Sequence, residues 1–313
     1  MRALVTGGAG FIGSHVVDAL LARGDQVSVV DDLSTGREEN LRGALEAGAV
    51  LHRLDIRDAA AVSELVEREA PEAILHLAAQ IDVRRSVREP ALDARINVEG
   101  TVNMLEAARG SGVARFVSTS TGGAIYGETE HLPTPETVPP NPEAPYGTSK
   151  YCAEQYCALY RRLHGLRTIT LRYGNVYGPR QDPLGEAGVV AIFCGRLVRG
   201  ERPTVFGDGR QTRDYVFVGD VVEANLAALA RPELGGEYNI GTGRETSVLD
   251  LVRELRELSG RQDFEPEFAP PRPGEVTRSS LDVGLARERL GWTATTPIAD
   301  GLRVTLEATP AEG

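Results

Sequence analysis

The segment Val5-Thr6-Gly7-Gly8-Ala9-Gly10-Phe11-Ile12-Gly13 places glycines at the spacing G-x-x-G-x-x-G directly after a short apolar stretch, Arg2 to Thr6. A helical pattern follows and continues through Leu21. Glycines between a strand and a helix allow a tight turn, and they let the backbone approach a pyrophosphate that lies on the amide end of the helix. We therefore expect a strand, a phosphate-binding turn and a helix at the start of the chain.

The next apolar segment, Val27 to Val30, leads into Asp31 and Asp32. An acidic side chain at the end of the second strand of such a unit can bind the ribose hydroxyls of a dinucleotide. A carboxylate there would repel the 2′-phosphate of NADP, so Asp31 favours NAD, although Arg37 is close enough in sequence to weaken this preference. The alternative for the two aspartates is a solvated turn.

Apolar and helical segments continue to alternate along the first half of the chain. Ala73 to Ala79 is apolar, Asn97 to Arg109 is helical in period, and Arg115 to Thr119 is apolar again. This order predicts an α/β protein with a Rossmann-type, doubly wound parallel sheet. His76 lies inside an apolar run and is expected to be a core histidine. Ligands of such sheets lie beyond the carboxyl ends of the strands, where we expect Asp55-Ile56, Leu77-Ala78-Ala79 and Ser118-Thr119-Ser120-Thr121.

The chain contains 33 arginines and a single lysine, Lys150, which follows Tyr146 by four residues. A proline-rich loop from Pro133 to Pro145 precedes them, and a helix is expected from Tyr146 to His164. Residues four apart share a helix face, and a nearby cation lowers the pKa of a phenol below its usual value near 10. We therefore expect Tyr146 to transfer protons, with its pKa lowered by Lys150; the alternative is a surface Tyr–Lys pair.

Composition narrows the classes of partner. The net charge of −11 argues against a nucleic-acid partner, and no run of about 18 apolar residues is available to span a membrane. The amino terminus lacks the pattern of a signal peptide, so a cytoplasmic location is expected. The three cysteines, Cys152, Cys157 and Cys194, show no metal-ligand spacing and are expected to be buried thiols, with no metal site.

From about Gly174 the pattern changes to short elements rich in glycine and proline. We expect residues 1–173 to form the dinucleotide-binding domain, and residues 174–313 to form mostly a smaller C-terminal α/β substrate-binding domain, with some segments returning to the first sheet. Ser247-Val248-Leu249-Asp250 predicts a capping box at the start of an amphipathic helix.

Motifs spread over nearly the whole chain resemble the extended short-chain dehydrogenase/reductase superfamily, and within it the UDP-glucose (UDP-galactose) 4-epimerase family. The segments that carry the resemblance are Thr6 to His15, Leu77 to Gln80, Ser120 to Gly127, Tyr146 to Lys150, Leu171 to Arg180, Gly207-Asp208-Gly209, Arg213-Asp214-Tyr215 and Arg272-Pro273-Gly274-Glu275.

The resemblance implies three catalytic residues: Tyr146 as the proton-transfer base, Lys150 on the nicotinamide ribose, and Thr121 on the sugar 4-hydroxyl. It implies, together with the crevice expected above, that NAD is bound by Gly7, Gly10, Phe11, Ile12, Gly13, Asp31, Asp32, Asp55, Ile56, Leu77, Ala78, Ala79, Asn97, Tyr146, Lys150 and Tyr173. It implies that the UDP-sugar is bound by Thr121, Asn175, Gly188, Val189, Val190, Phe206, Arg213, Tyr215, Arg272, Glu275 and Ser279. Arg213 and Arg272 would hold the diphosphate, because a guanidinium fork suits phosphate oxygens.

The implied reaction is epimerisation at carbon 4 of the hexose through a 4-keto sugar, with a tightly bound NAD that is regenerated in each cycle. UDP-glucose and UDP-galactose are the expected substrates, and a homodimer formed by the helices at 97–109 and 146–164 is expected from the resemblance. The small Ser279 leaves room for the N-acetylated sugars UDP-GlcNAc and UDP-GalNAc, because a bulky residue at this position tends to exclude them in the family.

Four alternatives share part of this pattern, and one of them, the decarboxylases of the same superfamily, places a carboxylate after the threonine and is disfavoured because glycines stand there. Nucleotide-sugar 4,6-dehydratases have an adjacent Asp-Glu after the threonine, where this chain has Gly122-Gly123, so that activity is disfavoured. A UDP-glucuronate 4-epimerase needs no such pair and remains open. A non-catalytic NAD sensor of the same fold would have little reason to keep Thr121, Tyr146 and Lys150 together.

Overall fold

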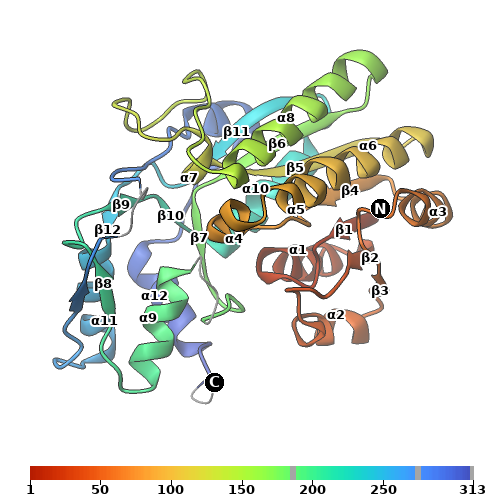
Figure 1. Cartoon of the computed structure of the whole chain (residues 1–313). Coiled ribbons are helices and arrows are strands. Elements are labelled where there is room, and N and C mark those ends of the chain that lie inside the picture. Colours follow the sequence, from red (N-terminus) through yellow and green to blue (C-terminus); the bar gives the residue numbers. More distant parts are fainter. Residues whose placement is uncertain (184–187, 272–275, 311–313) are drawn as a thin grey trace.

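Seven parallel strands form one sheet at the centre of the protein (Figure 1). The structure is a computed structural model that describes residues 1–183, 188–271 and 276–310. The order of the strands across the sheet is β3–β2–β1–β4–β5–β6–β11. The first six strands of this order are those of a Rossmann fold, with the change of winding direction between β1 and β4. The strands are β1 (Arg2–Thr6), β2 (Gln26–Asp31), β3 (Val50–Arg53), β4 (Ala73–His76), β5 (Arg115–Thr121), β6 (Thr168–Tyr173) and β11 (Gly236–Ile240). The predicted Rossmann-type sheet is confirmed.

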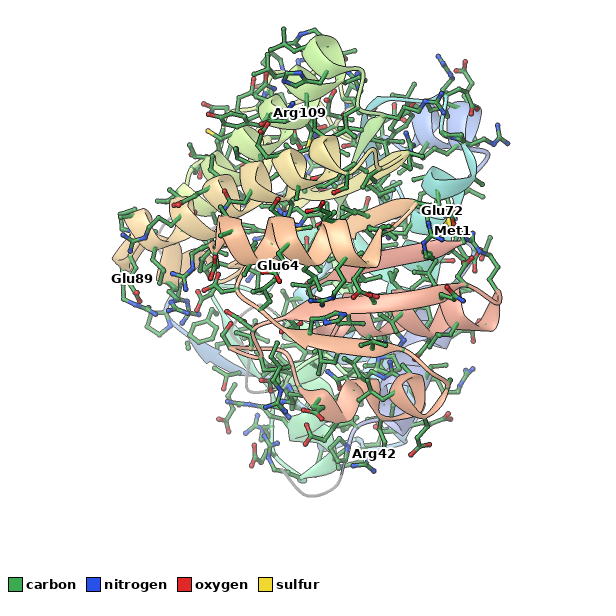
Figure 2. The ribbon with its side chains drawn as sticks, turned by 90° about the vertical axis from the view of Figure 1, so that its right-hand side faces the viewer. Met1, Arg42, Glu64, Glu72, Glu89 and Arg109 are labelled. Atoms are coloured by element: carbon green, nitrogen blue, oxygen red, sulfur yellow. The ribbon has the colours of Figure 1, made fainter. Side chains whose placement is uncertain are left out.

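Helices cover both faces of the sheet. On one face α1 (Phe11–Ala22) packs beside α10 (Val218–Ala230), and on the other α3 (Ala59–Glu69), α6 (Gly100–Gly110) and α8 (Pro145–His164) lie side by side. Figure 2 looks onto α3, which carries Glu64. Met1 and Glu72, which precede β1 and β4, lie at one edge of this view, and Glu89 lies at the opposite edge, toward which the strands run.

Alternate side chains of each strand pack against the two helical layers. Ala3 and Val5 of β1 belong to the core shared with α1 and α10, whereas Leu4 belongs to the core shared with α3, α6 and α8. Because both faces are buried, the strands read as continuous apolar runs, as is typical of parallel sheets. The remaining helices near this sheet are η1 (Glu38–Leu41), α2 (Arg42–Glu46), α4 (Val83–Arg88), α5 (Pro90–Ala94), η2 (Arg95–Glu99), α7 (Gly122–Ile125) and η3 (Ala286–Leu290).

One predicted helix is modified. The segment expected to be helical from Asn97 to Arg109 begins as the π-helical turn η2, and regular α-helix starts only at Gly100 in α6. The turn follows α5 without a break, so α5, η2 and α6 form one long helical path. An extra residue in a helical turn often marks a functional site.

Among the described residues, the second half of the chain contains three small two-stranded sheets (Figure 1). Helices α9, α11 and α12 share a separate core there, which contains Phe193, Leu251 and Leu302. The bounds of these strands and helices are β7 (Asn175–Tyr177), α9 (Val189–Val198), β8 (Thr204–Phe206), β9 (Thr212–Arg213), β10 (Tyr215–Phe217), β12 (Thr246–Ser247), α11 (Val248–Ser259), β13 (Glu267–Ala269) and α12 (Ile298–Glu307). The predicted capping box is confirmed, since Ser247 Oγ accepts from Asp250 N and Asp250 accepts from Ser247 N. β11 leaves this half and pairs with β6 of the large sheet.

Asp214 connects segments of the second half of the chain near the end of β11. Its buried carboxylate accepts hydrogen bonds from the amides of Thr242 and Gly243, which follow β11, and from the amide of Leu281. Among the described residues no helix is long and apolar enough to cross a membrane.

Candidate active site

The glycine loop between β1 and α1 is packed too closely to accept larger side chains. A Cβ at Gly13 would lie 2.1 Å from the carbonyl oxygen of Gly7, and a Cβ at Gly7, where φ is +69°, would lie 2.7 Å from the amide nitrogen of Ala78. Helix α1 begins at Phe11, and no side chain caps its first turn. The amide groups of this turn are therefore open to an anionic ligand.

The carboxylate of Asp31 holds this loop in place. One oxygen accepts a hydrogen bond from Ala9 N and the other from Leu33 N, each at 2.9 Å. Burial raises the pKa of Asp31, although both hydrogen bonds oppose the rise. Its neighbour Asp32 is exposed and accepts from the amide and hydroxyl of Ser34.

Arg37 is engaged elsewhere. Its Nη2 lies 3.1 Å from Asp182 Oδ2, and both side chains are about half exposed. The Asp182 carboxylate therefore pairs with the Arg37 guanidinium, the cation that could otherwise bind the 2′-phosphate of NADP. The geometry of Asp31, Arg37 and Asp182 favours NAD over NADP.

Asp55 and Ile56 follow β3 at the carboxyl edge of the sheet. Asp55 forms a bidentate pair with Arg57, which lowers the pKa of Asp55. Ile56 is buried against Gly100, where a Cβ would lie 2.5 Å from Ile56 Cδ1. The contacts predicted for Asp55 and Ile56 with the cofactor stay predictions.

Leu77, Ala78 and Ala79 leave β4 at this edge and are half-buried, while Ser120 near the end of β5 has a buried hydroxyl with no hydrogen-bond partner among the described residues. A glycine cradle that a Cβ would fill, an uncapped helix turn, an acidic residue at the end of β2 and an unpartnered hydroxyl lie along one edge of the sheet. These features fit a dinucleotide with its pyrophosphate on α1.

Tyr146 and Lys150 lie on the first turns of α8, and Thr121 ends β5, against which α8 packs. The Thr121 side chain lies close enough to the phenol of Tyr146 to interact with it. The backbone amide of Tyr146 donates to Ser86 Oγ at 3.1 Å. Between the tyrosine and the lysine, a Cβ at Gly147 would lie 2.4 Å from a carbonyl oxygen of α7, so only glycine allows this close approach.

The expected effect of Lys150 on Tyr146 is wrong for the protein without ligand. Burial raises the pKa of Tyr146 to about 12, and the interaction with the Thr121 side chain opposes this rise only in part. Burial likewise lowers the pKa of Lys150 to about 8. Removal from water is therefore the largest influence on the pKa of both groups.

Asn97 and Tyr173 use their polar atoms inside the protein. Asn97 Oδ1 accepts from the amide of Gln80 at 2.8 Å, and its Nδ2 donates to Ser149 Oγ at 3.0 Å. The Tyr173 hydroxyl is buried and donates to Asn225 Oδ1 at 3.0 Å. Contacts of Asn97 and Tyr173 with NAD stay predictions. The expected core position of His76 is confirmed, and burial lowers its pKa to about 3.

Gly122 and Gly123 follow Thr121 in a crowded place. A Cβ at Gly122 would lie 2.4 Å from Leu281 Cδ1, and one at Gly123 would lie 3.1 Å from Asn175 Oδ1. Asn175, predicted to contact the substrate, therefore lies beside the residues that follow Thr121. A carboxylate side chain at position 122 would have to displace Leu281.

The other predicted substrate contacts lie in the second half of the chain. Gly188 is the N-cap of α9, Val189 is half-buried, and Val190 is buried in the core. Gln181 links Gly188 to β7. Its side chain lies beside Gly188, and its Nε2 donates a hydrogen bond to the carbonyl oxygen of Val176 in β7.

Phe206 and Arg213 are half-buried at the ends of β8 and β9. Tyr215 is 6% exposed, and its ring is part of the core beside α9. Ser279 is half-buried next to Ser280, whose carbonyl accepts from Thr134 N. Arg272 and Glu275 lie outside the described residues.

Asp93 and Ser86 belong to no motif of the sequence, and Gln80 is known from the sequence only as the last residue of one. All three are buried beside α8 and η2. Ser86 supports the backbone of Tyr146, and Gln80 Nε2 donates to Asp93 Oδ1 at 2.9 Å. Ser86 and Asp93 are polar residues at helix positions that face the core, and they can be recognised only when the packing of the helices is known.

The matching family model, one similar relative and two similar solved structures all describe epimerases. Residues 3–241 match the NAD dependent epimerase/dehydratase family. The UDP-glucose 4-epimerase of Mycolicibacterium smegmatis is 50% identical over 308 residues and covers 98% of both chains. The structure of a UDP-glucose 4-epimerase with UDP-glucose from Thermotoga maritima is 50% identical, covers 98% of both chains and has a TM-score of 0.94. That of the Thermus thermophilus UDP-glucose 4-epimerase in complex with NAD is 46% identical, covers 99% of both chains and has a TM-score of 0.90.

Proposed function

The chain belongs to the NAD dependent epimerase/dehydratase family, and from this membership we propose that it interconverts UDP-glucose and UDP-galactose by inverting carbon 4 of the hexose, with NAD as its cofactor. The observation that carries the proposal is the group formed by Thr121, Tyr146 and Lys150 at the carboxyl edge of the sheet. Thr121 ends β5, and only β4 lies between β5 and β1, the strand that precedes the glycine loop. An oxidation and a reduction at one carbon need a proton acceptor and donor at this place.

Each member of the group has a distinct role. Tyr146 removes the proton of the 4-hydroxyl and later returns it, and Thr121, whose side chain lies beside the phenol of Tyr146, orients the hydroxyl and the phenol. Lys150 contributes a compact positive charge that favours the phenolate, which an arginine could not place in the same space. When bound, NAD supplies a reversible hydride acceptor for carbon 4. A firmly held NAD would explain how the reaction runs without an external oxidant.

The phenol of Tyr146 must lose its proton with less difficulty in the working enzyme than in the ligand-free protein. With a pKa of about 12, hardly any Tyr146 is ionised at neutral pH. When bound, the oxidised nicotinamide ring of NAD would add a positive charge to the site, and a nearby cation favours the phenolate. We therefore expect ligand binding to lower the pKa of Tyr146.

Dehydration at carbons 5 and 6 is disfavoured by the residues after Thr121. That reaction needs an acid and a base in addition to the tyrosine. Gly122 and Gly123 carry no such group, and the space beside Gly122 is filled by Leu281. Epimerisation at carbon 4 requires neither.

The range of sugars is proposed to extend to UDP-GlcNAc and UDP-GalNAc. Ser279 is small and half-buried, so its side chain leaves volume for an N-acetyl group. Ser279→Tyr should then reduce turnover of UDP-GalNAc at least tenfold while UDP-galactose is still converted, since a filled pocket discriminates by about 1–3 kcal/mol. Equal turnover of UDP-GalNAc by both proteins would contradict this extension.

The function is tested by following the purified protein with UDP-galactose by proton NMR, first without added NAD and then with NAD added to the same tube. Growth of UDP-glucose signals to a constant ratio is expected. Tyr146→Phe should lower the rate by about 10²–10⁴-fold and still bind NAD. No conversion of UDP-galactose even with added NAD would overturn the proposal, and UDP-glucuronate would be the next substrate to test.

A homodimer and a cytoplasmic location complete the proposal. Leu163 and Tyr156 on α8 are exposed at 66% and 38%, as is Val87 on α4 at 62%, and such apolar groups suit a contact with a second copy. Sedimentation of the protein and of Leu163→Glu would test the dimer, which this substitution should weaken. Three free cysteines agree with a reducing compartment.

A further inference from the structure

Asp93, the fourth residue of α5, is a buried carboxylate next to the candidate active site. Asp93 is only 1% exposed to solvent. Oδ1 accepts hydrogen bonds from Gln80 Nε2 at 2.9 Å and from Asn97 Nδ2 at 3.2 Å. Oδ2 is buried and has no hydrogen-bond partner among the described residues.

Other buried carboxylates of the described chain are better satisfied. Glu154 is paired with Arg172, Asp214 accepts from three backbone amides, and Asp220 accepts from Thr295 and Thr296. An unpartnered buried carboxylate oxygen costs free energy, which suggests that the charge serves a purpose other than stability.

The hydrogen bonds of Asp93 lead directly to the tyrosine. Asn97, which donates to Asp93, also donates to Ser149 Oγ at 3.0 Å, and Ser149 Oγ donates to the carbonyl oxygen of Tyr146 at 3.0 Å. Helix α5 packs against α8 along this network. The charge of Asp93 raises the pKa of both Tyr146 and Lys150.

We propose that Asp93 is a positioning residue for the Tyr146–Lys150 pair: through its hydrogen bonds it fixes the start of α8, which carries both side chains, and it places a buried negative charge beside them. Its oxygen Oδ1 fixes Asn97, and through Ser149 the first turn of α8, while Oδ2 contributes charge without a competing partner. The catalytic part of this role rests on the proposed function; the electrostatic part does not.

The other groups that face the pair come from three elements. Thr121 at the end of β5 faces Tyr146 and favours its ionised form. Glu154 and Cys157 on α8 favour the charged form of Lys150, and the imidazole of His76 on β4 lies within electrostatic reach of the lysine. Glu154 is neutralised by Arg172, and burial raises the pKa of the Cys157 thiol to about 11. Asp93 is therefore the carboxylate near Lys150 that lacks a cation of its own among the described residues.

The single lysine of the chain allows a direct test. Protein labelled with carbon-13 at the lysine ε position gives one side-chain NMR signal, from Lys150, without any assignment step. The wild-type signal should titrate with a midpoint near 8 in the ligand-free protein. Asp93→Asn keeps the shape and the acceptor Oδ1 but removes the charge, so the midpoint should fall by about half a unit to one unit.

A matched control is Glu89→Gln. Glu89 lies at the start of α5, is half exposed, pairs with Arg85, and is seen at the edge of the molecule in Figure 2. Removal of this charge should leave the Lys150 midpoint unchanged, because solvent screens exposed charges. If Asp93→Asn does not fold, Asp93→Ser gives the same comparison with a smaller acceptor. A midpoint equal to the wild-type value in the folded variant would overturn the proposal.

The kinetic consequence follows from the same sign. Without the charge of Asp93, Tyr146 should lose its proton at lower pH, so the acid limb of kcat/KM for UDP-galactose should move to lower pH by about half a unit to one unit in Asp93→Asn. A uniform loss of activity at all pH values with an unmoved limb would show a purely structural role and contradict the proposal. Because the NMR titration uses no substrate, a wild-type protein without epimerase activity would refute the proposed function and leave the test of Asp93 intact.

Discussion

Lys150 and Glu154 lie one turn apart on α8, both are buried, and the fold surrounds them in opposite ways. Glu154 receives two hydrogen bonds from Arg172, at 2.9 and 2.7 Å, and the same guanidinium donates to the hydroxyl of Tyr126. The Lys150 ammonium has no salt bridge within the part of the chain that the structure describes. We call Glu154 the sealed charge, because Arg172 pairs with both of its carboxylate oxygens. Lys150 is the open charge, because no carboxylate of the described residues pairs with it.

The difference separates stability from function along a single helix. A fully paired buried charge fixes the packing of α8 on β6, where Arg172 lies. An unpaired buried ammonium destabilises the ligand-free protein, since burial lowers the pKa of Lys150 to about 8 from 10.5. We expect such a charge to be retained because a ligand, rather than the protein, completes its surroundings.

The largest change in stability is expected from breaking the sealed pair. Glu154→Gln leaves the Arg172 guanidinium buried without a carboxylate, and the free energy of unfolding should fall by about 3–5 kcal/mol. Urea denaturation of Glu89→Gln, which removes one side of an exposed pair with Arg85, should show a fall below about 1 kcal/mol. Similar effects of the two substitutions would show that the buried pair of Glu154 with Arg172 contributes no more to stability than an exposed pair.

A gain in stability is expected when the open charge is removed. Because the pKa of Lys150 is lower in the folded protein than in the unfolded chain, stability is lost as pH falls from about 10.5 toward 8. Lys150→Met should therefore raise the free energy of unfolding of the NAD-free protein by about 3 kcal/mol at pH 7, and by less than about 1 kcal/mol at pH 10. The same variant should have no detectable epimerase activity.

Denaturation of wild type and Lys150→Met at both pH values checks this expectation. A methionine variant that is less stable than wild type at pH 7 would show that the ammonium has stabilising partners after all.

The smallest change in stability is expected at Tyr126, whose hydroxyl binds the Arg172 guanidinium of the sealed pair. The Tyr126 hydroxyl accepts from Arg172 Nη1 at 2.8 Å and donates to Asn239 Oδ1 at 2.8 Å, so it links β6 to β11. Tyr126→Phe should lower the free energy of unfolding by about 1–2 kcal/mol, since buried polar groups lose a partner. Activity at saturating substrate should stay within about threefold of wild type. A loss as large as that of Glu154→Gln would place Tyr126 among the residues that seal the pair.

Much of the site could be predicted from local patterns. The glycine spacing, the acidic residue after the second strand and the lysine four residues after a tyrosine are all properties of short segments, and the structure puts each on the expected element. The capping box of α11 is a local pattern of the same kind. The individual ligand contacts proposed for these residues stay predictions.

Other features depend on packing between distant segments. In the sequence Asp93 looks like an ordinary helical aspartate. The residues around it in the sequence do not reveal that Gln80 and Asn97 donate hydrogen bonds to its buried side chain. Leu281 fills the space beside Gly122 from 159 residues farther along the chain. The π-helical turn η2 also interrupts a helix that looks regular in sequence.

By itself the sequence determined the order of strands and helices, the phosphate-binding turn and the identity of the reactive pair, because spacing along a chain fixes which side chains share a strand end or a helix face. Only the tertiary structure decided the proton affinities of that pair. Spacing predicted a lowered pKa for Tyr146, whereas burial raises it to about 12. Removal from water is the sum of contributions from all surrounding segments, so no local pattern contains it.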